Sequence, residues 1–319
     1  MCPTPDRFPL PSPATHPGGA IPPDARLEPA PHPAPFPIQP LLHLDELWIQ
    51  VAGTECNLSC THCFVSAGPG VDRHGQMSAA AVRARVAEGL ALGVKEFYFT
   101  GGEPFVNPEL LEILAETLRS GPCTVLTNGT LLTVARIEAL RALSDAARYA
   151  LEIRVSLDGI DGPSHDRLRG AGAFARTIEA LLALERAGLL PIVTLTYPAE
   201  EDVLAFRELA VAALHGAGLV RPRLKLLPMF RHGREAQRTR GYGGVETLAG
   251  LTPAAFDPER LQCSGCRCVT SQGMFVCPLL VDEPSARMGQ RLDQTLGGFE
   301  LSHGACYTCW VTGMSCANS

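Results

Sequence analysis

The chain has 319 residues, 46% of them hydrophobic, and a formal net charge of −6. This acidic balance argues against general nucleic-acid binding, which usually needs a basic surface. No apolar run reaches membrane-spanning length, and the first residues lack the basic start and apolar core of a signal peptide. We therefore expect a cytoplasmic protein with one large core and a small appended domain, which binds neither nucleic acid nor membrane.

Residues 1–42 hold about half of the chain's 27 prolines, and in the run 29–35 every second residue is proline. Proline at this density prevents helices and sheet ladders and leaves extended, solvated chain. We predict a disordered tail over 1–42. A tail that docks a partner or covers an active site is the less favoured alternative.

From Leu44 to Leu227, apolar strand-like runs alternate with Ala- and Leu-rich helical stretches. This pattern predicts an α/β fold with parallel strands joined by helical crossovers. The predicted strands cover residues 47–51, 96–100, 124–127, 151–157, 191–196 and 223–227, and the predicted helices cover 79–92, 108–119, 134–143, 174–187 and 202–216. Ligands of such sheets bind at the carboxyl ends of the strands, so we expect the functional site there.

The loop after the first predicted strand carries Cys56, Cys60 and Cys63, spaced Cys-x3-Cys-x2-Cys. Each iron of a four-iron cluster needs a ligand, so three thiolates leave one iron open to bind a small molecule. A zinc knuckle or a disulfide pair is the alternative, but zinc sites usually repeat Cys-x2-Cys twice. The chain has twelve cysteines and no export signal, which also favours reduced thiols that serve as ligands. We take the isolated Cys123 to be a small core residue.

Polar motifs follow the next three predicted strands. They are Gly101-Gly102-Glu103-Pro104, Thr127-Asn128-Gly129 and Ser156-Leu157-Asp158. Glycines let the backbone approach a ligand closely, and carboxylates or carbonyls accept hydrogen bonds from an ammonium group. Hydroxyl and carboxylate groups at a strand end suit recognition of a ribose or an amino acid. These motifs and the cysteine loop are therefore predicted to meet at one edge of the sheet.

The cysteine spacing and the Gly-Gly-Glu-Pro motif together resemble the radical S-adenosylmethionine (SAM) superfamily. The resemblance implies a partial (β/α)6 barrel and a [4Fe-4S] cluster whose open iron chelates the amino and carboxylate groups of SAM. Reductive cleavage in the family gives a 5′-deoxyadenosyl radical. The resemblance implies Cys56, Cys60 and Cys63 as catalytic cluster ligands, and a cofactor pocket of Gly101, Gly102, Glu103, Pro104, Thr127, Asn128, Ser156, Asp158 and Arg169.

The segment after the fourth predicted strand resembles the branch of the superfamily that carries a C-terminal SPASM or "twitch" domain. In that branch a serine and a downstream arginine contact the SAM carboxylate, which implies these roles for Ser156 and Arg169. Arg167 is the alternative arginine. We interpret His165 and Asp166 as helix-start residues.

Seven cysteines lie between positions 263 and 316, far more than a reduced core needs. We predict a short hairpin from Cys268 to Cys277 with Gly273 at its turn. The set resembles the auxiliary [4Fe-4S] site of SPASM and twitch domains. It implies Cys277, Cys306 and Cys309 as ligands, with the fourth place open between Cys263, Cys266, Cys268 and Cys316. A structural zinc is the alternative. The expected domains are a barrel over 43–255 and a small cysteine-rich iron–sulfur domain over 256–319.

A basic segment surrounds the sixth predicted strand and contains almost no acid. Its members are Arg221, Arg223, Lys225, Arg231, His232, Arg234, Arg238 and Arg240. Most of them are expected to form a solvated face. Because 231–240 follows a strand end, it could instead bind a phosphate or carboxylate, which would make the substrate anionic. In that case neutralising Arg231 or Arg234 should weaken substrate binding and leave SAM cleavage intact.

The leading hypothesis is a radical SAM enzyme that takes hydrogen from a C–H bond of a small metabolite, such as a sugar or nucleoside, or of a peptide residue. Its electrons would come from a flavodoxin- or ferredoxin-type donor. The first alternative is a maturase of the SPASM branch that acts on ribosomally made peptides or sulfatases, and the second is a non-catalytic iron–sulfur carrier or scaffold. The stretch 1–42 is too short and proline-rich for the winged-helix peptide-binding domain of many peptide-modifying relatives, which favours a small metabolite or an unleadered peptide. Tyr197 and Asp282 are positions to inspect for a general acid or base.

Overall fold

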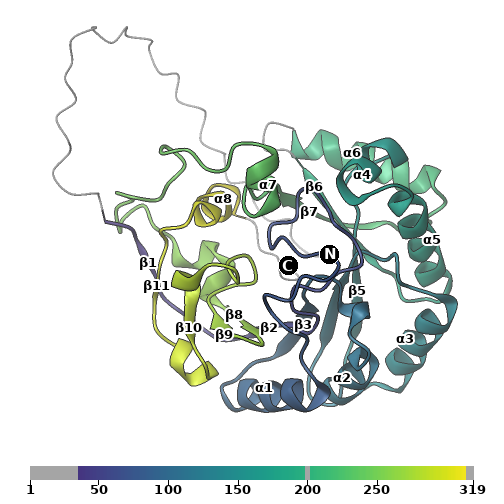
Figure 1. Ribbon diagram of the computed structural model, residues 1–319, viewed down its shortest axis with the longest axis horizontal. Coiled ribbons are helices and arrows are strands. Elements are labelled where there is room, and N and C mark those ends of the chain that lie inside the picture. Colours follow the sequence, from purple (N-terminus) through teal and green to yellow (C-terminus); the bar gives the residue numbers. More distant parts are fainter. Residues whose placement is uncertain (1–34, 198–201, 314–319) are drawn as a thin grey trace, which may run out of the picture. The chain divides into compact units, whose positions relative to one another are not determined.

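The computed structural model describes residues 35–197 and 202–313. Its main sheet has nine strands in the order β10-β9-β8-β2-β3-β4-β5-β6-β7. The strands from β2 to β7 are parallel (Figure 1), with bounds β2 Glu46–Gln50, β3 Glu96–Thr100, β4 Cys123–Thr127, β5 Leu151–Ser156, β6 Ile192–Tyr197 and β7 Arg223–Pro228. Each lies within one residue of its predicted bounds, so the predicted parallel α/β fold is confirmed.

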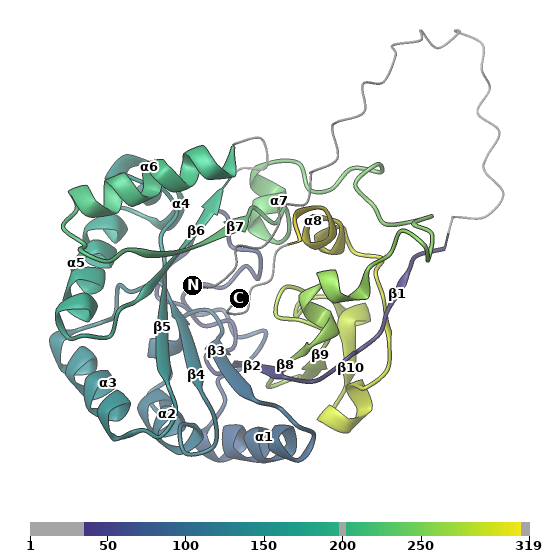
Figure 2. The ribbon, with the colours of Figure 1, turned by 180° about the vertical axis from the view of Figure 1, so that it is seen from behind.

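Helices line the outer face of these strands, as both views show (Figures 1 and 2). They are α1 Ala79–Ala91, α2 Leu110–Thr117, α3 Val134–Ala146, α5 Ala173–Arg186 and α6 Val203–Gly216. The side chains of Ser78, Thr133 and Asp202 accept hydrogen bonds from the first backbone N–H groups of α1, α3 and α6. Such caps satisfy donors that have no partner inside the helix, which explains why these helices begin where they do.

Helix α4, Gly162–Arg169, lies outside the five predicted helix ranges. Asp161 caps it through a hydrogen bond from Ser164 N, and a proline occupies its first turn. His165 and Asp166 therefore lie in the middle of a helix, and their interpretation as helix-start residues is wrong. His165 is fully buried, and its Nδ1 accepts a hydrogen bond from Asp158 N at 3.1 Å.

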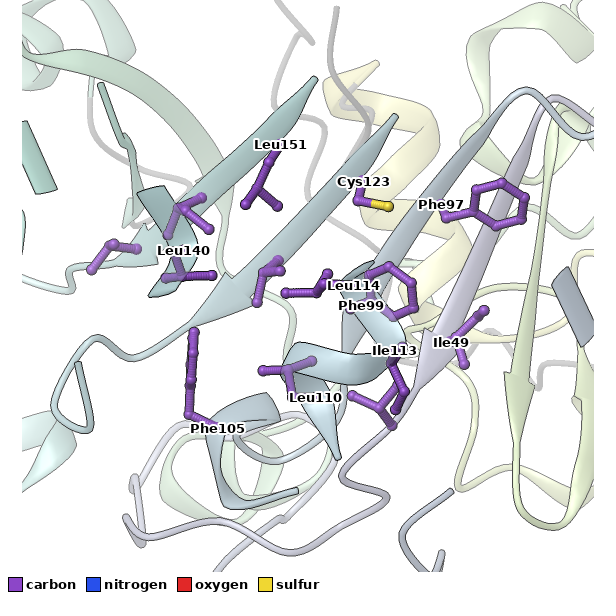
Figure 3. Packing of buried hydrophobic residues seen from close by; sticks show 14 of the residues in the cluster. Ile49, Phe97, Phe99, Phe105, Leu110, Ile113, Leu114, Cys123, Leu140 and Leu151 are labelled. Atoms are coloured by element: carbon purple, nitrogen blue, oxygen red, sulfur yellow. The ribbon is translucent and has the colours of Figure 1, made fainter. Parts of the chain in front are cut away.

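Alternate residues of each parallel strand face the helices and form the main core. Figure 3 shows Phe97, Phe99 and Cys123 of the strands packed against Leu110 and Ile113 of α2. Cys123 is 1% exposed, so its interpretation as a core residue is confirmed. Burial of this apolar face, at roughly 25 cal/mol per Å², is the main contribution to the stability of the sheet.

The opposite face of the strands is polar and aromatic. Trp48 of β2 stacks on Tyr98 of β3 with ring centroids 4.4 Å apart, and the Arg154 guanidinium of β5 lies 5.5 Å from the Tyr98 ring. Trp48 and Tyr98 belong to a second cluster of buried residues that also contains cysteines of the N-terminal loop and of the C-terminal region. The inner face of the barrel thus contacts both cysteine groups.

The C-terminal segment extends the same sheet. Strand β8, Cys266–Thr270, pairs in parallel with β2, and β9 Gly273–Phe275 and β10 Arg287–Gly289 continue the sheet in antiparallel fashion. Together β8 and β9 form the predicted hairpin, with Gly273 at φ +133° after the turn. The other helices are α7 Arg234–Arg238, α8 Gly304–Thr312 and the short 3-10 helices η1 Pro104–Val106, η2 Pro258–Arg260, η3 Gln262–Ser264, η4 Pro284–Ala286 and η5 Leu292–Thr295.

The expected tail is partly folded. Strand β1, Ile38–Gln39, pairs with β11, Phe299–Glu300, and Leu301 N donates to Pro37 O at 3.0 Å. The predicted disorder of residues 35–42 is therefore wrong, because the C-terminal segment offers this stretch an edge strand. The rest of the predicted tail, 1–34, and Cys316 lie outside the described residues. In the described part of the chain, every helix is too short or too polar to traverse a lipid bilayer.

Candidate functional site

A cavity of about 200 Å³ opens at the carboxyl ends of the parallel strands. The predicted site residues that line it are Cys56, Cys60, Cys63, Gly101, Gly102, Thr127, Asn128, Ser156, Asp158 and Arg169. Six further polar residues that the sequence analysis did not predict also line it: Gln50, His62, Thr100, Arg154, Thr194 and Thr196. The strand pattern could have found five of them, because Gln50, Thr100, Arg154, Thr194 and Thr196 lie on the inward-facing alternation of β2, β3, β5 and β6.

The three cysteines of the loop lie together at the mouth of this cavity. Cys56 and Cys60 are buried, and Cys63 is partly exposed. Burial raises the pKa of the Cys56 thiol to about 12. Burial also raises the pKa of Cys60, although the positive charge of Arg169 opposes the shift. Burial thus favours the neutral thiol at Cys56 and Cys60, so a metal cluster that binds them would release protons.

Contacts from distant parts of the chain fix this loop. Arg234 N donates to Cys63 O at 3.0 Å, and the Arg234 guanidinium donates to Ala67 O. Thr61 N donates to Leu168 O at 2.8 Å, at the end of α4. A Cβ atom at Gly233 would lie 2.2 Å from Phe64 O, so only glycine fits where α7 approaches the loop. The cysteine loop is therefore preorganised by α4 and by the segment before α7.

The Gly101-Gly102 segment packs directly on the cysteine loop. Gly102 N donates to Gly53 O at 2.8 Å. A Cβ atom at Gly102 would lie 2.1 Å from Glu55 O and 2.8 Å from Cys56 Cβ. The lack of a side chain at position 102 therefore brings the backbone of the second strand end beside the first cysteine.

Glu103 and Pro104 are buried and are not among the residues that line the cavity. Glu103 Oε1 accepts hydrogen bonds from Thr127 Oγ1 at 2.7 Å and Phe105 N at 3.1 Å, and Oε2 accepts one from Asn128 N at 2.7 Å. Burial raises the pKa of Glu103, while these three hydrogen bonds favour its carboxylate form. The Glu103 carboxylate therefore fixes the loop at residues 127–128.

Replacing Glu103 by glutamine should lower the free energy of unfolding by about 1–3 kcal/mol. The new NH2 group would face N–H or O–H donors in a buried site, and at least one of them would lose its acceptor. Thermal unfolding of the purified variant measures this loss. Glu112→Gln on the exposed face of α2 is the matched control, with a side chain 60% exposed. If Glu103→Gln and Glu112→Gln have equal melting temperatures, Glu103 does not stabilise the fold through the 127–128 loop.

Asn128 connects the third strand end to the cysteine loop. Its Nδ2 donates to Asn57 Oδ1 at 2.9 Å and lies 3.9 Å from Cys56 Sγ. Its Oδ1 accepts from Thr130 N at 2.9 Å. This network fixes the amide plane of Asn128 against the first cysteine.

Asp158 is the centre of a buried charge cluster on the other wall of the cavity. Its Oδ2 accepts from Arg169 Nε at 2.6 Å and lies 2.8 Å from His62 Nε2, and its Oδ1 accepts from Thr196 Oγ1. Burial opposes ionisation of Asp158, but the charge of Arg169 and these hydrogen bonds hold its pKa well below the usual range. Arg169 lines the cavity, whereas the alternative Arg167 is exposed. Ser156 also lines the cavity.

Four of the described C-terminal cysteines, Cys263, Cys266, Cys268 and Cys306, lie near Cys277. Burial raises the pKa of the Cys263 thiol most, and the proximity of Cys277 and Cys306 raises it further. Cys277 also contributes to the raised pKa of Cys266, Cys268 and Cys306. Burial raises the pKa of the Cys277 thiol to about 11, although the backbone N–H groups of Leu279 and Leu280 oppose the shift. Cys309 lies one turn after Cys306 on α8. Cys266 and Cys268 are fully buried within β8, between β2 and β9.

These thiols suit a cluster by their chemistry. Within 35–197 and 202–313, no three His, Cys, Asp or Glu side chains are arranged to hold one metal ion. A four-iron cluster binds each ligand through a different iron, so its thiols need not converge on a single point. The donor set at both cysteine groups consists of thiols, which are the ligands that iron–sulfur clusters take.

The predicted anion site in the basic segment gets no support from the structure. Arg231 pairs with Glu246 and lies over the Tyr242 ring, and Arg238 pairs with Glu235 at 2.8 Å. Arg234 is engaged with the cysteine loop. Glu235 within the segment, Glu246 after it and one backbone carbonyl thus account for these three arginines.

The two positions marked for a general acid or base lie apart from the main cavity. Tyr197 is 9% exposed and packs against Phe206. Asp282 pairs with Arg73 at 2.8 Å and with His74 at 3.2 Å, and it lines a second cavity of about 640 Å³. Phe64 lines both cavities, so the second one is a neighbour of the first.

A sequence model of the radical SAM superfamily matches residues 51–208. The AdoMet-dependent heme synthase of Methanosarcina barkeri is 34% identical over 142 residues, which are 44% of this chain and 38% of the relative. The mycofactocin maturase MftC of Mycobacterium tuberculosis is 30% identical over 172 residues, 53% of this chain and 42% of the relative. The subtilosin biosynthesis protein AlbA of Bacillus subtilis is 32% identical over 136 residues, 42% of this chain and 29% of the relative. The chain thus spans less than half the length of these relatives.

Solved structures share the fold. SuiB of Streptococcus suis bound to S-adenosylmethionine superimposes with a TM-score of 0.56 at 16% identity, over 79% of this chain and 64% of SuiB. The anSMEcpe structure with bound AdoMet and the Cp18Cys peptide superimposes with a TM-score of 0.57 at 15% identity, over 85% of this chain and 83% of that one. The matched segment contains the cysteine loop, Gly101-Gly102 and the Asp158 cluster, all of which meet at one cavity. The chain therefore belongs to the radical SAM superfamily.

Proposed function

We propose that the chain binds a [4Fe-4S] cluster and SAM in the main cavity and uses them to take hydrogen from a C–H bond of a peptide. The observation that carries this proposal is the meeting of three cysteines from one loop with Gly101-Gly102, Asn128 and Ser156 around a single cavity. When bound, the reduced cluster would supply the electron that cleaves SAM to the 5′-deoxyadenosyl radical.

Each wall of the cavity has a distinct task in this proposal. Cys56, Cys60 and Cys63 would ligate three irons and leave the fourth for SAM. The backbone of Gly101-Gly102 would approach the SAM amino group, as the family resemblance implies. Ser156 and Arg169 would hold its carboxylate, and Asp158 would orient Arg169 through their 2.6 Å hydrogen bond.

For the auxiliary [4Fe-4S] cluster we assign Cys263, Cys277, Cys306 and Cys309. The mutual proximity of Cys263, Cys277 and Cys306 supports the first three. Cys309 follows Cys306 at i+3 on α8, so both side chains lie on one face of that helix. Cys266 and Cys268 are enclosed in β8 and remain small core thiols in this assignment.

The second cavity supports a peptide as the substrate. It is lined by charged and polar side chains from both the barrel and the C-terminal segment, among them Arg73, Gln272, Glu283 and Arg287. A peptide offers alternating donors and acceptors that such a lining can bind while one residue enters the main cavity past Phe64. Two of the relatives named above are a bacteriocin biosynthesis protein and a maturase, and the anSMEcpe structure contains a peptide. A flavodoxin- or ferredoxin-type protein in the cytoplasm would donate the electrons.

Anaerobic reconstitution of the full chain tests this function. We expect about eight irons per chain and formation of 5′-deoxyadenosine from SAM with dithionite as reductant. Pools of synthetic peptides should raise that rate above the substrate-free level, while pools of sugars and nucleosides should not. If only sugars or nucleosides raise the rate, the substrate is a small metabolite and not a peptide. A reconstituted protein that neither binds nor cleaves SAM would make the chain an iron–sulfur scaffold or carrier.

A further inference from the structure

Arg267 is a fully buried cation in the middle of β8. Its side chain is 1% exposed and ranks among the largest fully buried side chains of the described residues. Its Nε donates to Thr295 O at 2.8 Å, Nη1 to Cys266 O at 2.7 Å and to Cys263 O at 2.9 Å, and Nη2 to Gly297 O at 3.2 Å. These carbonyls satisfy the N–H groups but carry no net charge.

No carboxylate balances this charge in the described part of the chain, since Arg267 takes part in none of its ion pairs. The guanidinium instead lies against the C-terminal cysteines, because it donates to the backbone carbonyls of Cys263 and Cys266. A buried cation without an anionic partner is costly and rare in folded proteins. A negative charge at the neighbouring cysteines would offset this cost.

A four-iron cluster ligated by four thiolates supplies that charge, because the ligand set makes the whole assembly anionic. Reduction adds one more electron. A fixed buried cation stabilises the reduced form more than the oxidised form, since the Coulomb attraction grows with the charge of the cluster and is strong at low dielectric constant.

We infer that Arg267 is the counter-charge of the auxiliary cluster and raises its reduction potential, an inference that rests on the proposed auxiliary site. Arg267 is a positioning and tuning residue, not a ligand. Its contact with the carbonyls of Cys263 and Cys266 would keep the guanidinium beside the cluster.

The test is a redox titration of the reconstituted full chain followed by electron paramagnetic resonance. The auxiliary signal is identified as the one that persists in a Cys56→Ala, Cys60→Ala, Cys63→Ala variant. In Arg267→Gln, the reduced-to-oxidised ratio at a fixed potential should fall about tenfold, which is about 59 mV for one electron. Arg267→Lys keeps the charge and loses part of the carbonyl contacts, so its midpoint should stay close to wild type. The control is Arg291→Gln, with a side chain 64% exposed, and it should leave the midpoint unchanged.

The outcomes separate charge from structure. Equal midpoints for wild type and Arg267→Gln would overturn the inference. If Arg267→Gln loses its auxiliary iron while Arg267→Lys keeps it, the charge is what holds the cluster and the inference stands. If both variants lose the iron, Arg267 acts only through its carbonyl contacts and the inference fails. A wild-type chain with about four irons and active SAM cleavage would refute the auxiliary cluster itself and leave the radical SAM site standing.

Discussion

Replacing Cys56, Cys60 and Cys63 together by alanine should abolish 5′-deoxyadenosine formation and leave about four irons on the chain. All three thiols come from one loop at the mouth of the cavity, and no other described cysteine lines it. The loop has no spare ligand, so the cluster that binds SAM should be lost completely. The described C-terminal cysteines lie on β8, η3, α8 and the loop after β9, and none of them is altered.

Iron, sulfide and zinc contents of the reconstituted variant, with SAM cleavage assayed in parallel, measure this result. Cys123→Ala is the control, because it removes a fully buried thiol that belongs to neither group. It should keep both clusters and SAM cleavage. A triple variant that still cleaves SAM would contradict the role of the loop. A triple variant that holds zinc or no metal would contradict the proposed auxiliary cluster. It would not contradict the assignment of Cys56, Cys60 and Cys63 to the first cluster.

The parallel strands could be predicted because their pattern is local. Each of the six is a short apolar run whose alternate residues face the helices, and the helices between them begin at Ser, Thr or Asp caps in several cases. Helix α4 was missed because it is short and polar and presents little apolar surface. Its position depends on the Asp161 cap and on the buried His165, which no periodicity reveals.

The candidate site was only partly predictable for a different reason. Motifs at strand ends indicate which residues gather, but not which of them touch a ligand. The carboxylate of Glu103 binds the 127–128 loop, 24 and 25 residues away, and therefore supports the cavity from outside it. The pairing of β8 with β2 joins residues more than 200 positions apart. Arg267, between two cysteines, looks like an ordinary outward-facing strand residue until that pairing buries it.

The basic segment shows the same limit. In sequence, 231–240 reads as a run of positive charge. In the fold, Glu235 and Glu246 neutralise Arg238, Arg231 and Arg240, and Arg234 fixes the cysteine loop. The segment thus fixes the cysteine loop through Arg234, and most of its positive charges are paired with acids of the protein.

Asp158→Asn should lower the free energy of unfolding by about 3–5 kcal/mol, because it leaves the buried Arg169 without its carboxylate. The Asp158 and Arg169 side chains are 2% and 12% exposed, so water screens this pair weakly. Arg169→Met should also destabilise the fold, since Asp158 then keeps only His62 and Thr196 as partners. The double variant should lose less than the sum of the two, because neither charge is then left alone.

The pH dependence of this stability has a definite sign. Because the pKa of Asp158 is lowered in the folded protein, its stabilising effect is present above the pKa of the unfolded chain, about 3.9. It is lost as the pH falls through the lower, folded value. The difference in unfolding free energy between wild type and Asp158→Asn should therefore be constant from pH 5 to 8 and shrink only in acid below about pH 4.

Denaturant unfolding of the four proteins of this cycle measures the coupling, and SAM binding measures its consequence for the site. Asp158 holds both Arg169 and His62, and all three line the cavity, so Asp158→Asn should weaken SAM binding as well as folding. The exposed pair Arg291 and Asp293, 64% and 48% exposed, is the matched control and should contribute little to either measurement. Additive losses in the double variant would mean that Asp158 and Arg169 stabilise the wall separately. A loss of stability with unchanged SAM binding would place the pair in the scaffold alone, and Ser156 would then remain as the carboxylate contact that the family resemblance implies.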